Sequence, residues 1–224
     1  MQQKLTVVVP VVNDDDALAG LLPLLHAWRL PIVVVDGADA ASTVAVVGED
    51  AVYLAAQPSR GGQIALALKN IVTPWVWVLH ADTRPSEEAL TFVQSLSEQE
   101  IPGWGRFDVV LPGLRGISFF MNWRSRWSKI CTGDQAMFFH TQLLVEAGGF
   151  PRQPLMEDIE ISKRLKRCAG SAFHAPHIFV EASPRRWRSR GVLRTVFSMW
   201  SFRLRYFFGA KPETLVRQYY RSQY

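Results

Sequence analysis

Residues 75–85 read WVWVLHADTRP, and the change from an apolar run to a polar turn within them indicates the fold of the chain. Residues 75–80 carry no charge and are rich in Val and Trp, which predicts a strand buried on both faces. In open α/β sheets ligands bind at the carboxyl ends of strands, so Asp82 is a candidate to hold a metal ion or a ligand hydroxyl. The structural alternative is that Asp82 caps a helix that begins near Ser86.

Apolar strands alternate with helices on the amino-terminal side of this stretch. Strands are predicted at residues 5–12, 32–36 and 52–55, and helices at residues 14–28, at 41–47 and from the loop 57–63 to residue 71. Asp14 is expected to cap the first helix. The short links predict a parallel sheet with right-handed crossovers. The fold class is therefore α/β, with a Rossmann-like, mostly parallel sheet flanked by helices.

The carboxyl-terminal side is less regular. After a helix at residues 86–97, strands are predicted at 104–111, 132–140 and 177–180. Helices are predicted at 114–130 and 155–167, and a short helix follows residue 140 and ends at 147. Two more helices are predicted at the end of the chain. The helix at 114–130 mixes aromatic with basic residues, and packing of these aromatic side chains in the core is favoured over insertion into a surface.

Composition places the chain among folded proteins. Its 224 residues, 48% of them hydrophobic, can bury one core, as one domain or one domain with an appendage. No secretory signal is apparent, and two cysteines are too few for a disulfide framework. We expect a cytoplasmic protein.

Charge is divided unevenly along the chain. Residues 1–114 carry 6 basic and 13 acidic groups, whereas residues 115–224 carry 19 and 7. From residue 184 on, basic residues are interleaved with aromatic ones, which is typical of contact with nucleic acid, anionic lipid or phosphorylated small molecules. The tryptophans favour lipid, and no nucleic-acid partner is expected. Arginines interrupt the longest apolar stretch, so this part of the chain is not expected to span a membrane. Residues 184–224 are predicted to form amphipathic helices on or beside a domain of residues 1–183. We expect these helices to rest on the inner face of a membrane.

Seven short motifs, taken together, resemble the family 2 glycosyltransferases. They are VVVPVVND at residues 7–14, VDG at 35–37, RGGQ at 60–63, HAD at 80–82, GDQ at 133–135, MED at 156–158 and RRW at 185–187. The motifs follow the order of the family, and this order is far more specific than any one tripeptide.

The resemblance implies a GT-A fold and inverting transfer of a sugar from a nucleotide-diphosphate sugar, with a UDP-sugar favoured, to an acceptor hydroxyl. It implies that Asp158, next to Glu157, is the catalytic base. It assigns to the nucleotide sugar Pro10, Val12, Asn13, Asp36, Gly37, Arg60, Gln63, His80, Ala81 and Asp82. It assigns to the acceptor and diphosphate side Asp134, Gln135, Arg186 and Trp187.

The resemblance also implies Mg²⁺ or Mn²⁺ on Asp82, which matches the last carboxylate of the family's Asp-x-Asp motif. Carboxylate and phosphate oxygens suit such a cation, which stabilises the charge that develops on a leaving diphosphate. A carboxyl group near an apolar wall can have a pKa high enough to accept the acceptor proton. His80 replaces the first Asp of the motif and could ligate the metal, contact the nucleotide or only fill space, and His177 is a further candidate ligand.

Two other functions stay open on the sequence. A nucleotidyltransferase of related fold would share the metal carboxylate and release pyrophosphate. A catalytically silent nucleotide-sugar binding or scaffold protein would explain His80 in place of an acid. Residues 60–62 could also form a generic phosphate cradle at a helix start, although no Walker lysine pattern follows them. A homo-oligomer is compatible with each of these functions.

Overall fold

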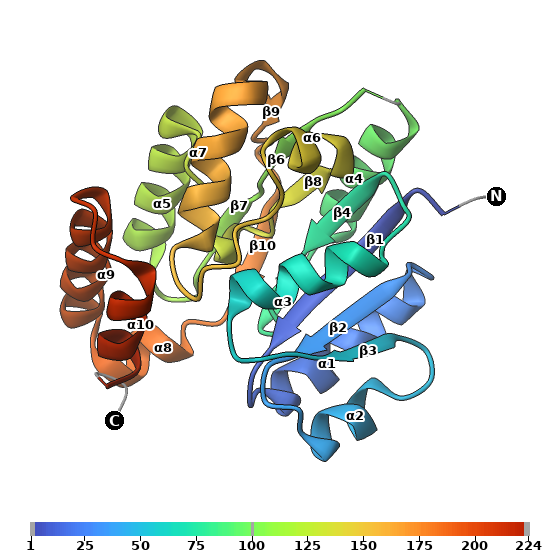
Figure 1. Cartoon of the computed structure of the whole chain (residues 1–224), viewed down its shortest axis with the longest axis horizontal. Helices are drawn as coiled ribbons and strands as arrows, with labels where there is room; N and C mark the ends of the chain where they lie inside the picture. The colour runs from blue at the N-terminus through green and yellow to red at the C-terminus, as the bar shows by residue number, and fades with distance from the viewer. Residues whose placement is uncertain (1–2, 100, 222–224) are drawn as a thin grey trace.

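The structure, a computed structural model, describes residues 3–99 and 101–221, and the side chains of residues 186, 190 and 219–221 lie outside this description. Within these residues the main sheet has the order β3-β2-β1-β4-β8-β6-β9 (Figure 1). Its strands are β1 (Leu5–Val11), β2 (Ile32–Asp36), β3 (Val52–Ala55), β4 (Trp75–Val78), β6 (Trp104–Gly105), β8 (Phe138–His140) and β9 (Phe173–His174). The strands β1 to β4 run parallel, and β8 is antiparallel to β4. The predicted mostly parallel sheet is therefore confirmed.

Helices cover both faces of this sheet because its central strands are apolar on both faces. Val7 and Trp77 contribute to the core on one face, and Val8 and Val76 to the core on the other. The helices on the first face are α1 (Asp15–Ala27), α2 (Ala41–Val47) and α4 (Glu87–Glu98). Those on the second face are α3 (Arg60–Ala67), α6 (Thr141–Glu146) and α7 (Glu157–Ala169). Neither face of the central strands β1, β2 and β4 meets water, which explains their continuous apolar runs.

A smaller sheet has the order β5-β10-β7. Its strands are β5 (Thr83–Pro85), β7 (Asp108–Val110) and β10 (Phe179–Ala182). The single strand predicted at residues 104–111 is therefore wrong, because β6 belongs to the main sheet and β7 to the smaller one. Arg106 and Phe107, both fully buried, cross between the two sheets, and the N–H of Phe107 donates to the carbonyl of Gln135 at 2.9 Å.

Helices also form the carboxyl-terminal side of the molecule (Figure 1). They are α5 (Arg115–Ser128), α8 (Arg185–Arg190), α9 (Val192–Phe207) and α10 (Pro212–Arg221). The two helices predicted at the end of the chain are found as α9 and α10. The described chain has a further short helix before them, α8, and Gly191, with φ +82°, separates it from α9. No described helix is long and apolar enough to cross a bilayer.

The α5 helix packs against α9 through Met121, Val196 and Met199. Many aromatic side chains of both helices nevertheless remain exposed. They are Phe119, Phe120, Trp123 and Trp127 on α5 and Phe197, Trp200 and Phe207 on α9. The expectation that the aromatic side chains of residues 114–130 pack in the core is therefore wrong for the four exposed ones on α5. The domain boundary at residue 184 stays a prediction.

Candidate functional site

Asp36 closes the turn that follows β2. Its carboxylate is fully buried and accepts hydrogen bonds from the backbone N–H groups of Ala38 and Ala40, both at 2.8 Å. The hydroxyl of Tyr53 donates a third hydrogen bond at 3.2 Å. The sequence assigned Asp36 to the nucleotide, and in the structure its carboxylate holds the backbone of this turn.

Gln63 ties the carboxyl ends of β1 and β2 together. Its amide group is buried and donates to the carbonyl of Val11 at 2.9 Å and to that of Val35 at 2.7 Å. Gly37 passes close by, and a Cβ on this residue would overlap the side chain of Val12 and the backbone of Pro58. This part of the edge is therefore packed too tightly for larger residues.

An ion pair lies just past the end of β1. Pro10 is buried inside the strand, whereas Val12 and Asn13 are exposed beyond it. The side-chain cap predicted at Asp14 is wrong, because its carboxylate makes no cap hydrogen bond and accepts instead from Nη2 of Arg185, at 2.9 and 2.7 Å. This ion pair joins the start of α8 to the edge of the sheet.

A chain of polar contacts crosses the end of β4. Arg60, the first residue of α3, donates Nε to the buried Glu157 and Nη1 to Nε2 of His80, the latter at 3.1 Å. Nδ1 of His80 lies 3.2 Å from Oδ1 of Asp134. Because a guanidinium only donates, Nε2 of His80 is an acceptor and the ring proton sits on Nδ1. Both ring nitrogens are therefore occupied by described neighbours, which argues against a role for His80 as a metal ligand.

Asp82 follows His80 and the buried Ala81 and is itself partly buried. Burial raises the pKa of its carboxyl group above the ordinary 3.8, and the nearby carboxylates of Asp134 and Asp14 raise it further. Among the described residues, no group of three His, Cys, Asp or Glu side chains is placed to hold a metal ion alone. A carboxylate with such acidic neighbours does fit a divalent cation that takes its other ligands from phosphate oxygens.

The start of α7 brings another carboxylate to this place. Asp158 lines a cleft together with Arg60 and Asp134, and its Oδ2 accepts from the N–H of Gly133 at 3.1 Å. Glu157 is only 1% exposed; burial raises the pKa of its carboxyl group and Arg60 lowers it. The structure therefore gathers three of the predicted acids, Asp82, Asp134 and Asp158, around the end of β4.

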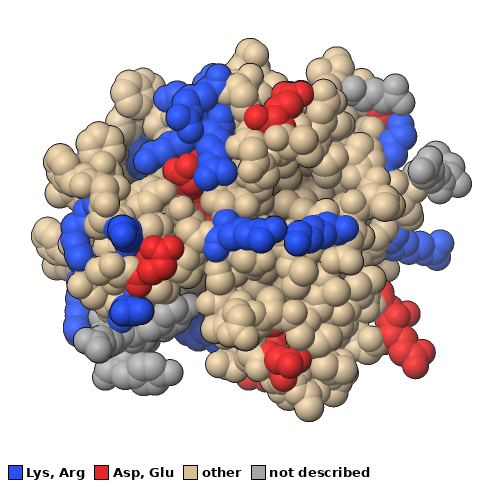
Figure 2. Space-filling model, viewed as in Figure 1, with Lys and Arg blue, Asp and Glu red and all other residues tan. Residues whose placement is uncertain are grey.

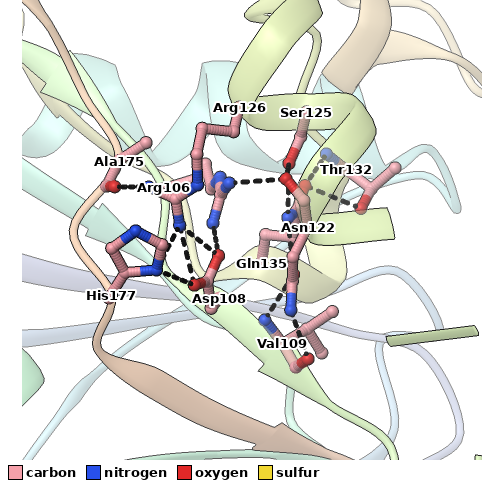
Figure 3. A network of polar contacts seen from close by, with 10 residues as sticks. All are labelled: Arg106, Asp108, Val109, Asn122, Ser125, Arg126, Thr132, Gln135, Ala175 and His177. Atoms are coloured by element: carbon pink, nitrogen blue, oxygen red, sulfur yellow. Dashed lines mark hydrogen bonds and ion pairs between the residues drawn. The ribbon is translucent and has the colours of Figure 1, made fainter. Parts of the chain in front are cut away.

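Gln135 is fully buried among Thr132, Asn122 and Ser125 (Figure 3) and is not one of the residues that line the cleft. Its Oε1 accepts from the backbone N–H and the hydroxyl of Thr132 at 3.2 and 3.3 Å. Its Nε2 donates to Asn122 at 3.2 Å and to Ser125 at 2.9 Å. Gln135 therefore fastens the loop that carries Asp134 to α5.

His177 and Asp82 lie near opposite ends of β10. Nδ1 of His177 lies 3.3 Å from Oδ2 of Asp108, in a network with Arg106 and Arg126 (Figure 3). Phe179 at the start of β10 pairs with Asp108, and Ala182 at its end pairs with Thr83, which follows Asp82. The structure thus does not bring His177 to the proposed metal carboxylate. This network was not predicted from the sequence. The only sign of it there is that two charged residues, Arg106 and Asp108, interrupt the otherwise apolar stretch 104–111.

Trp187 forms one wall of a cavity of about 230 Å³ between α5 and α9. It is 6% exposed and packs against Val109 and Met121. Arg124 of α5 lines the same cavity and was also missed from the sequence, where it is one of several basic residues in an aromatic helix. The side chain of Arg186 lies outside the described residues.

The structure is similar to three solved structures that contain nucleotide sugars. TarS 1–349 of S. aureus, in complex with UDP-GlcNAc, is 19% identical with a TM-score of 0.65; the match covers 81% of this chain and 58% of that one. The mannosyltransferase PcManGT from Pyrobaculum calidifontis, in complex with GDP-Man and Mn²⁺, is 20% identical with a TM-score of 0.58, over 81% and 57%. Glucosyl-3-phosphoglycerate synthase from Mycobacterium tuberculosis, with Mn²⁺ and UDP-glucose, is 15% identical with a TM-score of 0.57, over 79% and 70%.

This likeness shows the fold, and the GT-A fold implied by the sequence motifs is confirmed. The chain spans less than two thirds of the length of the TarS and PcManGT chains. No protein-family model and no curated protein matches the sequence.

Proposed function

We propose that this chain is an inverting glycosyltransferase that moves a sugar from a nucleotide-diphosphate sugar, with a UDP-sugar favoured, to an acceptor hydroxyl. The observation that carries the proposal is the meeting of Asp82, Asp134 and Asp158 at the carboxyl edge of the sheet, where open α/β proteins bind ligands. The donors present in the similar structures support a nucleotide sugar here.

On the donor side, Asp82 would hold Mg²⁺ or Mn²⁺ together with the diphosphate oxygens. When bound, the cation neutralises the negative charge that develops on the departing nucleoside diphosphate. Arg60 would add positive charge at the same place, held there by Glu157 and His80. Two of the similar structures contain Mn²⁺, which favours this metal.

The nucleotide would lie over the ends of β1 and β2. Val12 and Asn13 are exposed there and are the side chains that we assign to direct contact. Asp36 already accepts hydrogen bonds on both oxygens, so it would meet the base only through its remaining lone pairs. Its main contribution is the shape of the turn.

Asp158 is the proposed base. Displacement of the nucleoside diphosphate by an acceptor oxygen requires a group that takes the hydroxyl proton. Asp158 lines the cleft, and the N–H of Gly133 orients its carboxylate. Glu157, next to it, is buried against Arg60 and is a positioning residue in this proposal.

The test is to incubate the protein with a panel of nucleotide sugars, with and without Mn²⁺, and to measure released nucleoside diphosphate and pyrophosphate. We expect one donor to release nucleoside diphosphate, and this release to be lost in Asp82→Ala and Asp158→Asn. Pyrophosphate release would instead identify a nucleotidyltransferase. Donor binding without turnover in the presence of varied hydroxyl acceptors would identify a silent binding protein and overturn the proposal.

The exposed aromatic side chains of α5 and α9 favour attachment to the inner face of a membrane. Trp127 is 81% exposed and Phe197 73% exposed, and apolar side chains exposed to this degree on neighbouring helices are typical of a membrane contact. In Figure 2, basic side chains gather on the side of the molecule where Figure 1 shows α5, α7 and α9. This charge fits anionic lipid.

Sedimentation with vesicles that contain phosphatidylglycerol tests this attachment. The wild type should sediment with the vesicles at low salt, and the double variant Trp127→Ser with Phe197→Ser should not. Val145→Ser, a control at an apolar residue that is 76% exposed on α6, should behave as the wild type. A wild type that stays in the supernatant would rule out the attachment.

A further inference from the structure

The cavity between α5 and α9 is lined by Arg124, whose guanidinium makes no direct ion pair with any described residue. Nε and Nη2 of Arg124 are buried, and neither has a hydrogen-bond partner among the described residues. Burial lowers the pKa of its guanidinium, and the nearby Asp158 raises it. A guanidinium keeps its proton in proteins, and an unpaired buried charge is costly unless a ligand pairs with it. The described residues therefore leave two nitrogen atoms of Arg124 available to a ligand.

The cavity opens onto the cleft of the proposed base. Thr132, Met199 and Arg203 line both the cavity and the cleft that contains Asp158. A molecule held in the cavity would therefore extend into the cleft beside Asp158, which is where an acceptor hydroxyl has to lie.

The walls of the cavity define the chemistry of its ligand. Trp187, Met199 and Trp200 make them largely apolar, and Arg124 and Arg203 supply two positive charges. A phosphate monoester carries between one and two negative charges near neutral pH and suits the bidentate geometry of guanidinium groups. At the rim, Phe120 and Trp200 are exposed with ring centroids 6.1 Å apart, next to the other exposed aromatic side chains of the two helices. An apolar chain attached to the phosphate could leave along this surface.

We propose that this cavity binds a phosphate group carried by the acceptor, with Arg124 as its counter-ion and an apolar chain along Phe120 and Trp200. The identification of the ligand as the acceptor rests on the proposed glycosyl transfer, whereas the phosphate site itself does not. Lipid-linked phosphates and water-soluble phosphate esters share the chemistry that Arg124 recognises, and the choice of probes separates these two sources.

Calorimetric titration of the full chain with octyl phosphate, octan-1-ol and glycerol 3-phosphate tests the site. We expect octyl phosphate to bind the wild type about tenfold or more tightly than octan-1-ol, because charge-assisted hydrogen bonds form only with the phosphate. Arg124→Gln should lose this preference and Arg124→Lys should keep part of it. Arg194→Gln, which removes an exposed arginine of α9 outside the cavity, should bind as the wild type.

Comparable binding of glycerol 3-phosphate would assign the site to water-soluble phosphate esters and overturn the placement of an apolar chain along Phe120 and Trp200. Binding of octyl phosphate alone would assign the site to a lipid headgroup. Equal affinity for octyl phosphate and octan-1-ol, or equal binding by the wild type and Arg124→Gln, would overturn the proposal. Met199→Trp, which fills the cavity without changing its charge, is a second variant expected to abolish octyl phosphate binding. UDP titrated into the same samples separates the two proposals, since a failure to bind UDP would count against the glycosyltransferase alone.

Discussion

Two stretches of the same sheet edge use their polar side chains differently. At the ends of β1 and β2, Asp36 and Gln63 are buried and bond mainly to the backbone, which fixes the shape of the edge. Around the end of β4, Asp82 and Asp158 lie near other charged side chains, and burial raises the pKa of Asp82. Acids kept close together reduce stability and are typical of places where chemistry uses them. Substitutions in the first region should therefore reduce stability, and those in the second should reduce activity.

The largest effect is expected at Asp158. Asp158→Asn should lower the rate of sugar transfer by about a hundredfold to ten-thousandfold, the range typical of a general base, and leave the melting temperature nearly unchanged. Rates with a donor identified from the panel measure this. Glu160→Gln on the same helix is the control, since Glu160 pairs with Arg164 outside the cleft and should affect the rate little. If Glu160→Gln slowed transfer as much as Asp158→Asn, the rate would not depend specifically on the carboxylate in the cleft, and the contrast between the two regions would fail.

The next largest effect is expected at Gln63. Gln63→Leu removes two buried hydrogen bonds to the carbonyls of Val11 and Val35 and should lower the free energy of unfolding by about 1–3 kcal/mol. Urea denaturation measures this change. Gln142→Leu removes an exposed hydrogen bond to Glu146 and should cost less than about 0.5 kcal/mol. If the two variants were equally stable, Gln63 would not be the clamp that we describe.

A smaller effect is expected at Gly133, which faces His80. A Cβ at this position would overlap the ring of His80, so Gly133→Ala should displace the ring from Arg60 and Asp134. We expect transfer to slow by about tenfold while the chain stays folded. Gly116→Ala is the matched control, because its Cβ would meet nothing within 4 Å. Unchanged kinetics in Gly133→Ala would show that the position of His80 has no bearing on catalysis.

The smallest effect concerns His174, which lies outside both regions. Burial lowers the pKa of its ring below 6.5, and the ring packs against Phe92 with centroids 6.2 Å apart. The ring of His174 therefore takes up a proton at higher pH in the unfolded chain than in the folded chain. The contribution of the neutral ring to stability is fully present above about pH 6.5 and is lost as the pH falls through the folded-state pKa. Melting temperatures should fall between about pH 7 and about pH 5, and less so in His174→Asn. The pKa of His140 is also lowered by burial, so the variant should remove only part of the loss. An identical fall in the variant would attribute the acid sensitivity to other groups.

The regular half of the fold could be predicted from the sequence. Continuous apolar runs such as the one at residues 75–78 are decided by local composition, and they gave the parallel strands β1 to β4. The acidic residues of the cleft were found through motif order, because each follows a strand or begins a helix. The two short strands β5 and β9 and the change of sheet at Arg106 depend on distant partners, and no local pattern marks them.

The uses of individual polar side chains were also beyond the sequence. A glutamine next to two glycines looks the same whether it contacts a ligand or, as Gln63 does, two backbone carbonyls. Asp14 could be expected to cap α1 until Arg185, far along the chain, was seen to pair with it. Arg124 gave no signal because a missing counter-ion becomes visible only after every neighbour has been placed.

Binding of UDP with and without Mn²⁺, measured by calorimetry for the wild type and for Asp82→Asn, tests the central claim most directly. If the carboxylates around the end of β4 form the donor site, Mn²⁺ should strengthen UDP binding to the wild type by about tenfold or more and have little effect on the variant. Equal dependence on Mn²⁺ in the two proteins, or no UDP binding to the wild type, would contradict the account.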